Sequence, residues 1–98
     1  MMLFGNINKG LEEYRTTANA VLVDVREPYE FVFGHIPGAV NIPLSAIAAT
    51  TLPKDTPLFL YCLRGSRSKQ AAGVLKQNGY SRVKSIGGIK QYKGQLEK

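Results

Sequence analysis

Two nearly unbroken apolar runs most constrain how this chain can fold. Ala20–Val25 is rich in β-branched residues and is interrupted only by Asp24, and Leu58–Tyr61 contains no charged side chain. Such runs are typical of strands that are buried on both faces, as in a parallel sheet. The sequence therefore predicts two buried strands, the second of which delivers the chain to Cys62.

Helical and turn signals alternate with these strands along the chain. We expect a helix over 7–18, a helical turn over 28–31, helices over 44–49, 69–78 and 89–98, and short strands over 40–42 and 83–86. Gly34–Ala39 and Gly87–Gly88 are interpreted as turns. Strands that alternate with helices predict an α/β fold with a central, mainly parallel β-sheet.

Composition narrows the class of protein. The chain has 98 residues, the size of one domain, so we expect a single domain over 1–98. One cysteine excludes an internal disulfide and one histidine leaves no zinc cluster, so we expect neither a metal nor another cofactor. No apolar run approaches the ~20 residues that span a bilayer, so we expect no membrane association.

Charge and the amino-terminal residues bear on partners and location. Thirteen basic and seven acidic residues give a net charge of +6, which favours anionic partners. Basic residues do not interleave with aromatic ones, and we expect no nucleic-acid binding. The scattered lysines either draw anions toward the site or keep the protein soluble. Met1–Gly5 lack the features of a secretory signal, so we expect a cytoplasmic protein.

The segment Tyr61–Ser68 carries the chemistry. Cys62 ends an apolar strand at the carboxyl edge of the predicted sheet, where α/β proteins place ligands. Gly65 lets successive amide N–H groups point inward, and the next helix adds unpaired N–H groups. A cysteine in an apolar strand is by itself more often a packing residue. Arg64 and Arg67 beside it instead predict an anion cradle that stabilises a Cys62 thiolate.

Four segments, in this order and spacing, resemble the signatures of a single-domain rhodanese (thiosulfate sulfurtransferase). The segments are Val23–Phe31, Gly34–Pro43, the Cys62 loop and Gly87–Gly88. The resemblance covers about residues 20–92, most of the chain. It implies a parallel sheet with helices on both faces and a cysteine that cycles between thiolate and persulfide.

The resemblance also implies roles for individual residues. Cys62 matches the catalytic, sulfur-accepting cysteine. The substrate-binding loop comprises Leu63, Arg64, Gly65, Ser66, Arg67 and Ser68. Its backbone N–H groups would surround the persulfide. Asp24 and Arg26 match a polar pair that supports the site, and His35 matches a histidine that is usually structural. Where the family commonly has tryptophan this chain has Tyr92, which we interpret as a packing substitution.

Several of these residues have alternative roles. Asp24 and Arg26 lie two positions apart, so their side chains share a side; they either form an ion pair that shapes the pocket or contact substrate. Ser66 and Ser68 either donate hydrogen bonds to a bound anion or cap the helix. We interpret His35 as hydrogen-bonded within a turn.

Loop length separates two related activities. Four residues lie between Cys62 and Arg67, a Cys-x4-Arg spacing. Cysteine phosphatases, including those that resemble rhodaneses, use Cys-x5-Arg, because their loop must enclose a tetrahedral phosphate. The shorter loop favours a small sulfur group on Cys62 over phosphatase chemistry.

We therefore predict a sulfurtransferase. The Cys62 thiolate would take the outer sulfur of a small anionic donor such as thiosulfate and pass it to cyanide or to a thiol of a small molecule or a protein. The alternative is a persulfide carrier that serves a protein partner in a sulfur relay. An exposed apolar patch beside the loop would favour the carrier, and a deep pocket limited to small anions would favour the independent enzyme.

Overall fold

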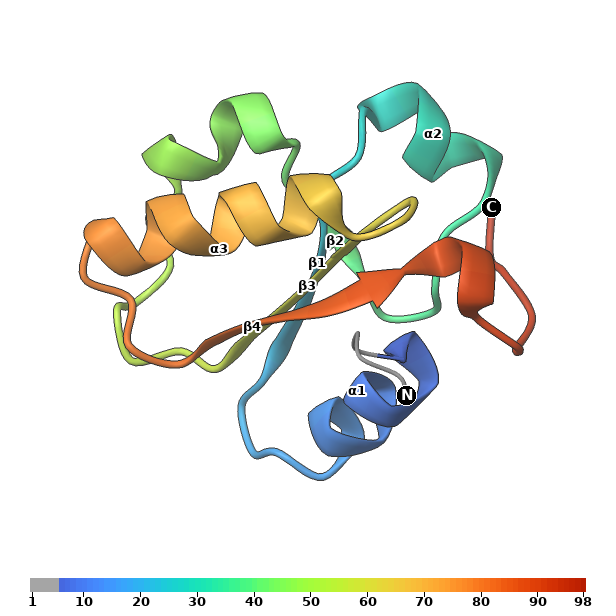
Figure 1. Ribbon diagram of the computed structural model, residues 1–98, viewed down its shortest axis with the longest axis horizontal. Helices are drawn as coiled ribbons and strands as arrows, with labels where there is room; N and C mark the ends of the chain where they lie inside the picture. Colours follow the sequence, from blue (N-terminus) through green and yellow to red (C-terminus); the bar gives the residue numbers. More distant parts are fainter. Residues whose placement is uncertain (1–5) are drawn as a thin grey trace.

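A computed structural model describes residues 6–98, so the prediction over Met1–Gly5 lies outside the described residues. Its centre is a four-stranded parallel sheet of order β2-β1-β3-β4 (Figure 1). The strands are β1 (Val21–Asp24), β2 (Val40–Asn41), β3 (Leu58–Cys62) and β4 (Val83–Gly88). The helices are α1 (Ile7–Arg15), α2 (Pro28–Phe33) and α3 (Ser66–Gln77), with 3-10 helices η1 (Leu44–Ala49) and η2 (Ile89–Gln91).

Helices cover both faces of the sheet, as predicted. Figure 1 shows α3 and η1 on one face and α1 on the other. Neighbouring residues of β1 and β3 alternate between two cores: Val23 and Leu60 pack under α3, whereas Leu22 and Phe59 pack against α1. All five residues of β3 are buried, which explains why the sequence there shows no alternation of polar and apolar residues.

The end of β4 differs from the prediction of a turn at Gly87–Gly88. Both glycines are strand residues that pair with Tyr61 and Cys62 of β3. The pairing skips Ile86, because Leu60 pairs with Ser85 and Tyr61 with Gly87. Gly87 has φ +115°, a conformation that favours glycine. Where two glycines suggested a turn, the strand therefore contains a β-bulge and continues to Gly88.

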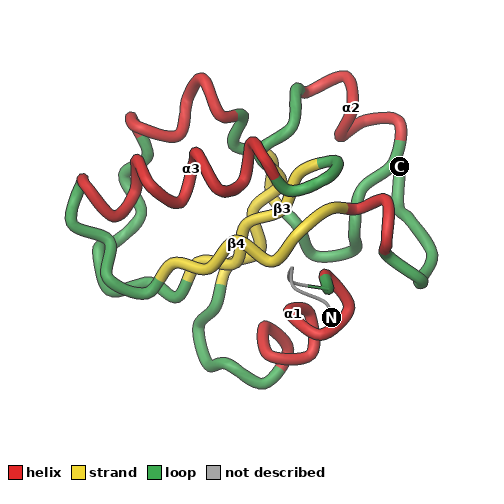
Figure 2. Tube along the Cα trace, viewed as in Figure 1, coloured by secondary structure: helices red, strands yellow, loops and turns green. Residues whose placement is uncertain are grey.

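The predicted helix over 89–98 is also wrong. Only Ile89–Gln91 is helical, as one 3-10 turn, and the rest of the segment is loop (Figure 2). The chain then crosses toward α2, where Glu97 and His35 exchange two backbone hydrogen bonds of 2.8 Å. This long-range pairing takes the place of a helix. Among residues 6–98, no helix has the length and apolar character of a bilayer span.

Helix α3 begins at Ser66 rather than at Lys69. Gly65 precedes it with φ +118°, which only glycine adopts readily. The loop after Cys62 is consequently short, and the first turn of α3 lies beside it. The helix predicted over 7–18 ends earlier, at Arg15, because Thr16 caps it.

Candidate active site

Cys62 lies at the carboxyl end of β3, and its sulfur is enclosed by the loop that follows. The residue is 1% exposed. The Gly65 N–H donates a hydrogen bond to Sγ at 3.0 Å, and the Ser68 N–H lies 3.4 Å from Sγ. The Ser68 hydroxyl lies 3.7 Å from the same sulfur. Two amide dipoles and one hydroxyl thus converge on the sulfur, as the glycine and the helix start indicated.

β4 supports the loop from one side. A side chain at Gly88 would collide with the backbone of Leu63 and Arg64, so only glycine allows this close approach. The Lys90 N–H donates a hydrogen bond of 3.2 Å to the Leu63 carbonyl oxygen. The end of β4 and the start of η2 therefore fix the position of the loop that carries Cys62.

A cavity of about 620 Å³ opens between the loop and β4. Three of its lining residues are cationic, namely Arg64, Lys69 and Lys90, and within residues 6–98 no acidic residue lines it. Leu63, Gly65 and Ser66 from the loop also line it. An anion in this cavity would meet positive charge on three separate elements, which lowers its energy there.

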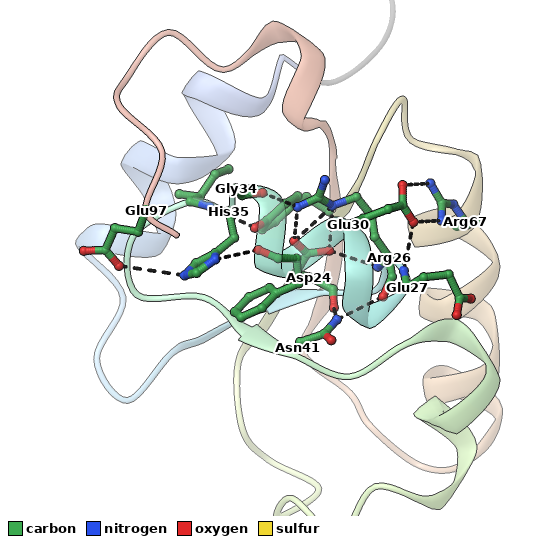
Figure 3. A network of polar contacts seen from close by, with 12 residues as sticks. Asp24, Arg26, Glu27, Glu30, Gly34, His35, Asn41, Arg67 and Glu97 are labelled. Carbon is green, nitrogen blue, oxygen red and sulfur yellow. Dashed lines mark hydrogen bonds and ion pairs between the residues drawn. The ribbon is translucent and has the colours of Figure 1, made fainter.

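Arg67 is not part of this cavity. Its guanidinium forms a two-pronged ion pair with Glu30 of α2, with Nη1–Oε1 and Nη2–Oε2 distances of 2.7 and 3.1 Å (Figure 3). The hydrogen bond from Arg67 lowers the pKa of Glu30, and the same bond raises the pKa of Arg67. The two arginines of the loop are thus separated: Arg64 lines the cavity, and Arg67 ties α3 to α2.

Asp24 and Arg26 form the ion pair that their spacing suggested. They are 0% and 6% exposed. Arg26 Nε donates to Asp24 Oδ1 at 2.9 Å, and Nη2 donates to Oδ2 at 2.7 Å and to the Gly34 carbonyl at 2.8 Å. Burial opposes the charged form of Arg26, but the hydrogen bonds and charge of Asp24 outweigh it and raise its pKa. Neither side chain lines the cavity beside the loop.

His35 lies in the same polar network but serves the fold. Its Nδ1 is 2.9 Å from the Phe31 carbonyl oxygen, and its ring stacks on Phe31 with a centroid distance of 3.7 Å. Nε2 lies 3.9 Å from a Glu97 carboxylate oxygen. Figure 3 shows these contacts side by side: Glu97 with His35, Arg26 with Asp24 and Gly34, and Glu30 with Arg67.

Sequence reasoning missed four contributors to the site. Lys69 and Lys90 were considered only as scattered basic residues, although the strand order brings the end of β4 beside Cys62. Asn41 donates to the Asp24 and Arg26 carbonyl oxygens, both at 2.9 Å. In the sequence, only its position within Gly34–Pro43, a segment that resembles the family, pointed to it. Ser85 gave no signal, because a serine within a strand is unremarkable.

The chain matches a known protein family over most of its length. The rhodanese-like domain family matches residues 8–95. A protein named "Sulfurtransferase" from Allochromatium vinosum is 43% identical over 76 residues, 74% of this chain and 71% of that one. "Thiosulfate sulfurtransferase PspE" of Escherichia coli K12 is 39% identical over 72 residues, 69% of each chain.

One solved structure shares the fold over the whole chain. The crystal structure of SSP1007 from Staphylococcus saprophyticus superposes with a TM-score of 0.82 and 29% identity. The superposition covers 99% of this chain and all of that one. Together with a family match over most of its length, this places the chain in the rhodanese-like family of sulfurtransferases.

Proposed function

We propose that this protein moves a sulfane sulfur from a small anionic donor of the thiosulfate type, through a persulfide on Cys62, to a thiol or to cyanide. One observation carries the proposal: the Cys62 sulfur accepts loop N–H groups at 3.0 and 3.4 Å. Two names among the relatives, a sulfurtransferase and a thiosulfate sulfurtransferase, support it. A reduced thiol at Cys62 suits a reducing compartment, so we place this activity in the cytoplasm.

The reaction proceeds in two substitutions at sulfur. The Cys62 thiolate attacks the outer sulfur of thiosulfate; a new S–S bond forms, and the donor's S–S bond breaks with its electron pair leaving on sulfite. The acceptor, cyanide or a thiolate, then attacks the outer sulfur of the persulfide, and the Cys62 thiolate leaves. The Gly65 and Ser68 N–H groups stabilise negative charge on Cys62 at the start and at the end of the cycle.

The donor anion binds in the cavity beside the loop. Arg64, Lys69 and Lys90 line that cavity, whereas the guanidinium of Arg67 is occupied by the Glu30 carboxylate. This assigns different roles to the two arginines of the loop. Arg64 contacts the donor, and Arg67 holds the first turn of α3 against α2. The loop N–H groups close directly on Sγ, which suits a single added sulfur better than a phosphate.

Matched substitutions of the two arginines test this assignment. Arg64→Gln is expected to raise the KM for thiosulfate about tenfold with little change in kcat, because it removes a charged contact made already in the ground state. Arg67→Gln is expected to leave KM within about twofold and to lower the melting temperature, since it removes the ion pair with Glu30. Initial rates of thiocyanate formation give both constants. An equal rise of KM in both variants would show that Arg67 also binds the donor.

A second candidate, persulfide transfer to a partner protein, is favoured by the exposed side of α2. Tyr29, Val32 and Phe33 are 67%, 67% and 76% exposed. The same helix is joined to the start of α3, beside the loop, through the Glu30–Arg67 ion pair. Three large apolar side chains on six residues form a patch of the kind that protein partners cover. We propose that its occupant is a protein that offers a cysteine thiol to the Cys62 persulfide.

Substitutions in the apolar patch of α2 distinguish transfer to cyanide from transfer to a protein thiol. We expect the Tyr29→Ser/Phe33→Ser variant, loaded with labelled sulfur, to transfer it to cyanide at the wild-type rate. Transfer to reduced proteins in an extract of its own cells is expected to fall about tenfold, because apolar anchors dominate docking energy. Val40→Ser, an exposed apolar residue of β2, is the control. Unchanged protein labelling in the double variant would exclude α2 as the docking surface.

A further inference from the structure

Two serine hydroxyls link the sulfur of Cys62 to the cavity. Ser68 of α3 is completely buried, and its Oγ lies 3.7 Å from the Cys62 sulfur. Ser85 of β4 lines the cavity, and its Oγ lies 2.7 Å from Ser68 Oγ. The chain of contacts is therefore sulfur, Ser68, Ser85 and cavity. Sequence reasoning considered Ser68, but gave Ser85 no role.

Ser85 lies directly before the β-bulge in β4. Side chains alternate along the strand, so Lys84 bonds Glu13 of α1 on one face and Ser85 meets Ser68 of α3 on the other. Pairing with β3 then skips Ile86, which packs into the α1 core. Ser85 is thus the last residue before the bulge whose side chain faces the loop. Bulges near active sites commonly re-aim side chains.

The Ser68 hydroxyl has one proton and three acceptors within reach. They are the Gly65 carbonyl oxygen, to which Ser68 donates at 3.0 Å, Ser85 Oγ at 2.7 Å, and the sulfur of a Cys62 thiolate. As a thiol, Cys62 instead donates to Ser68 Oγ, at 3.7 Å. The Gly65 carbonyl already accepts the Lys69 N–H at 3.1 Å, so it keeps a partner when Ser68 turns away. If Ser85 donates to Ser68 Oγ, Ser68 can no longer donate to Ser85. Its proton is then available to the sulfur.

We propose that Ser85 is a positioning residue: its hydroxyl donates to Ser68 Oγ and thereby directs the Ser68 proton onto the Cys62 thiolate. A hydrogen bond to an anionic sulfur is stronger than one to a neutral carbonyl, and each bond of the chain polarises the next. No proton changes its heavy atom in this step; both hydroxyls only rotate. The consequence for sulfur transfer rests on the proposed function, but the effect on the thiolate does not.

A pair of isosteric variants isolates the hydroxyl of Ser85. Ser85→Thr keeps the hydroxyl, Ser85→Val removes it, and both are β-branched residues that suit a strand. The rate of Cys62 alkylation by iodoacetamide at neutral pH follows the thiolate. We expect this rate to fall about fivefold in Ser85→Val, as for the loss of one hydrogen bond, and to stay within about twofold in Ser85→Thr. Ser81→Ala, at an exposed serine before β4, is the control and should leave the rate unchanged.

A double-mutant cycle tests whether Ser85 acts through Ser68. Ser85→Ala, a smaller change in case the valine variant does not fold, is compared in wild-type and Ser68→Ala backgrounds. We expect Ser85→Ala to lower the alkylation rate of Cys62 in the wild-type background and to lower it no further in Ser68→Ala. Equal rates in Ser85→Thr and Ser85→Val, or an additive loss in the double variant, would overturn the proposal. Alkylation needs no sulfur donor, so these outcomes are independent of whether thiosulfate is a substrate.

Discussion

Replacing Cys62 by serine is expected to lower kcat/KM for sulfur transfer from thiosulfate to cyanide by at least about 10³-fold. Loss of a covalent nucleophile has effects of this size or larger, because a hydroxyl cannot carry the transferred sulfur. The fold should tolerate the change. Serine is slightly smaller than cysteine, and its oxygen can accept the Gly65 N–H that now bonds to Sγ at 3.0 Å. Thiocyanate formation at saturating cyanide measures the activity.

The melting temperature distinguishes a chemical from a structural cause of this loss. We expect Cys62→Ser to unfold within a few degrees of wild type, since its neighbours keep their hydrogen bonds. Activity retained in a folded Cys62→Ser variant would refute a covalent role for the cysteine, because Cys62 is the only cysteine in the sequence. A variant that melts far below wild type would instead assign the residue to packing.

The second large effect concerns stability. Asp24→Ala is expected to reduce the free energy of unfolding by about 3–5 kcal/mol, because it leaves the Arg26 guanidinium buried without its counter-charge. Arg26 is only 6% exposed, and its Nε and Nη2 donate three hydrogen bonds to the Asp24 carboxylate. For a chain of this size such a loss is a large share of the total stability. Urea unfolding followed by circular dichroism gives the value.

The exposed ion pair Lys84–Glu13 is the matched control. Its side chains are about half exposed, and Glu13→Ala is expected to cost no more than about 1 kcal/mol. If Asp24→Ala costs as little as Glu13→Ala, the Asp24–Arg26 pair contributes no more than a surface pair. Should Asp24→Ala fail to fold, Asp24→Asn is the alternative, because it retains one acceptor oxygen. Its loss of unfolding free energy is expected to lie between those of Asp24→Ala and Glu13→Ala.

The buried strands could be predicted because an unbroken apolar run by itself indicates a strand covered on both faces. β1 and β3 are apolar on both faces, which happens where helices cover a sheet on each side, and this placed Cys62 at the strand end that carries the site. The two-residue spacing of Asp24 and Arg26 placed their side chains on one side and left open whether they pair or contact substrate; the structure shows the ion pair. The two buried strands, which needed only local pattern, were thus confirmed.

Features that depend on contacts between distant segments could not be predicted. The partner of Arg67 is Glu30, which is 37 positions away, and no local pattern distinguishes a paired arginine from one that binds substrate. Gly88 lies in β4 because it pairs with Cys62, and it must be glycine because the backbone of Leu63 and Arg64 passes close to it. The end of the chain pairs with His35 instead of forming a helix, although its composition suits either.

The intact mass of the protein before and after exposure to thiosulfate tests most directly whether Cys62 carries the transferred sulfur. We expect the wild-type protein to gain the mass of one sulfur atom and to lose it when cyanide or a thiol is added, and we expect Cys62→Ser to gain nothing. The absence of any gain in the wild type, or an equal gain in Cys62→Ser, would contradict a persulfide on Cys62.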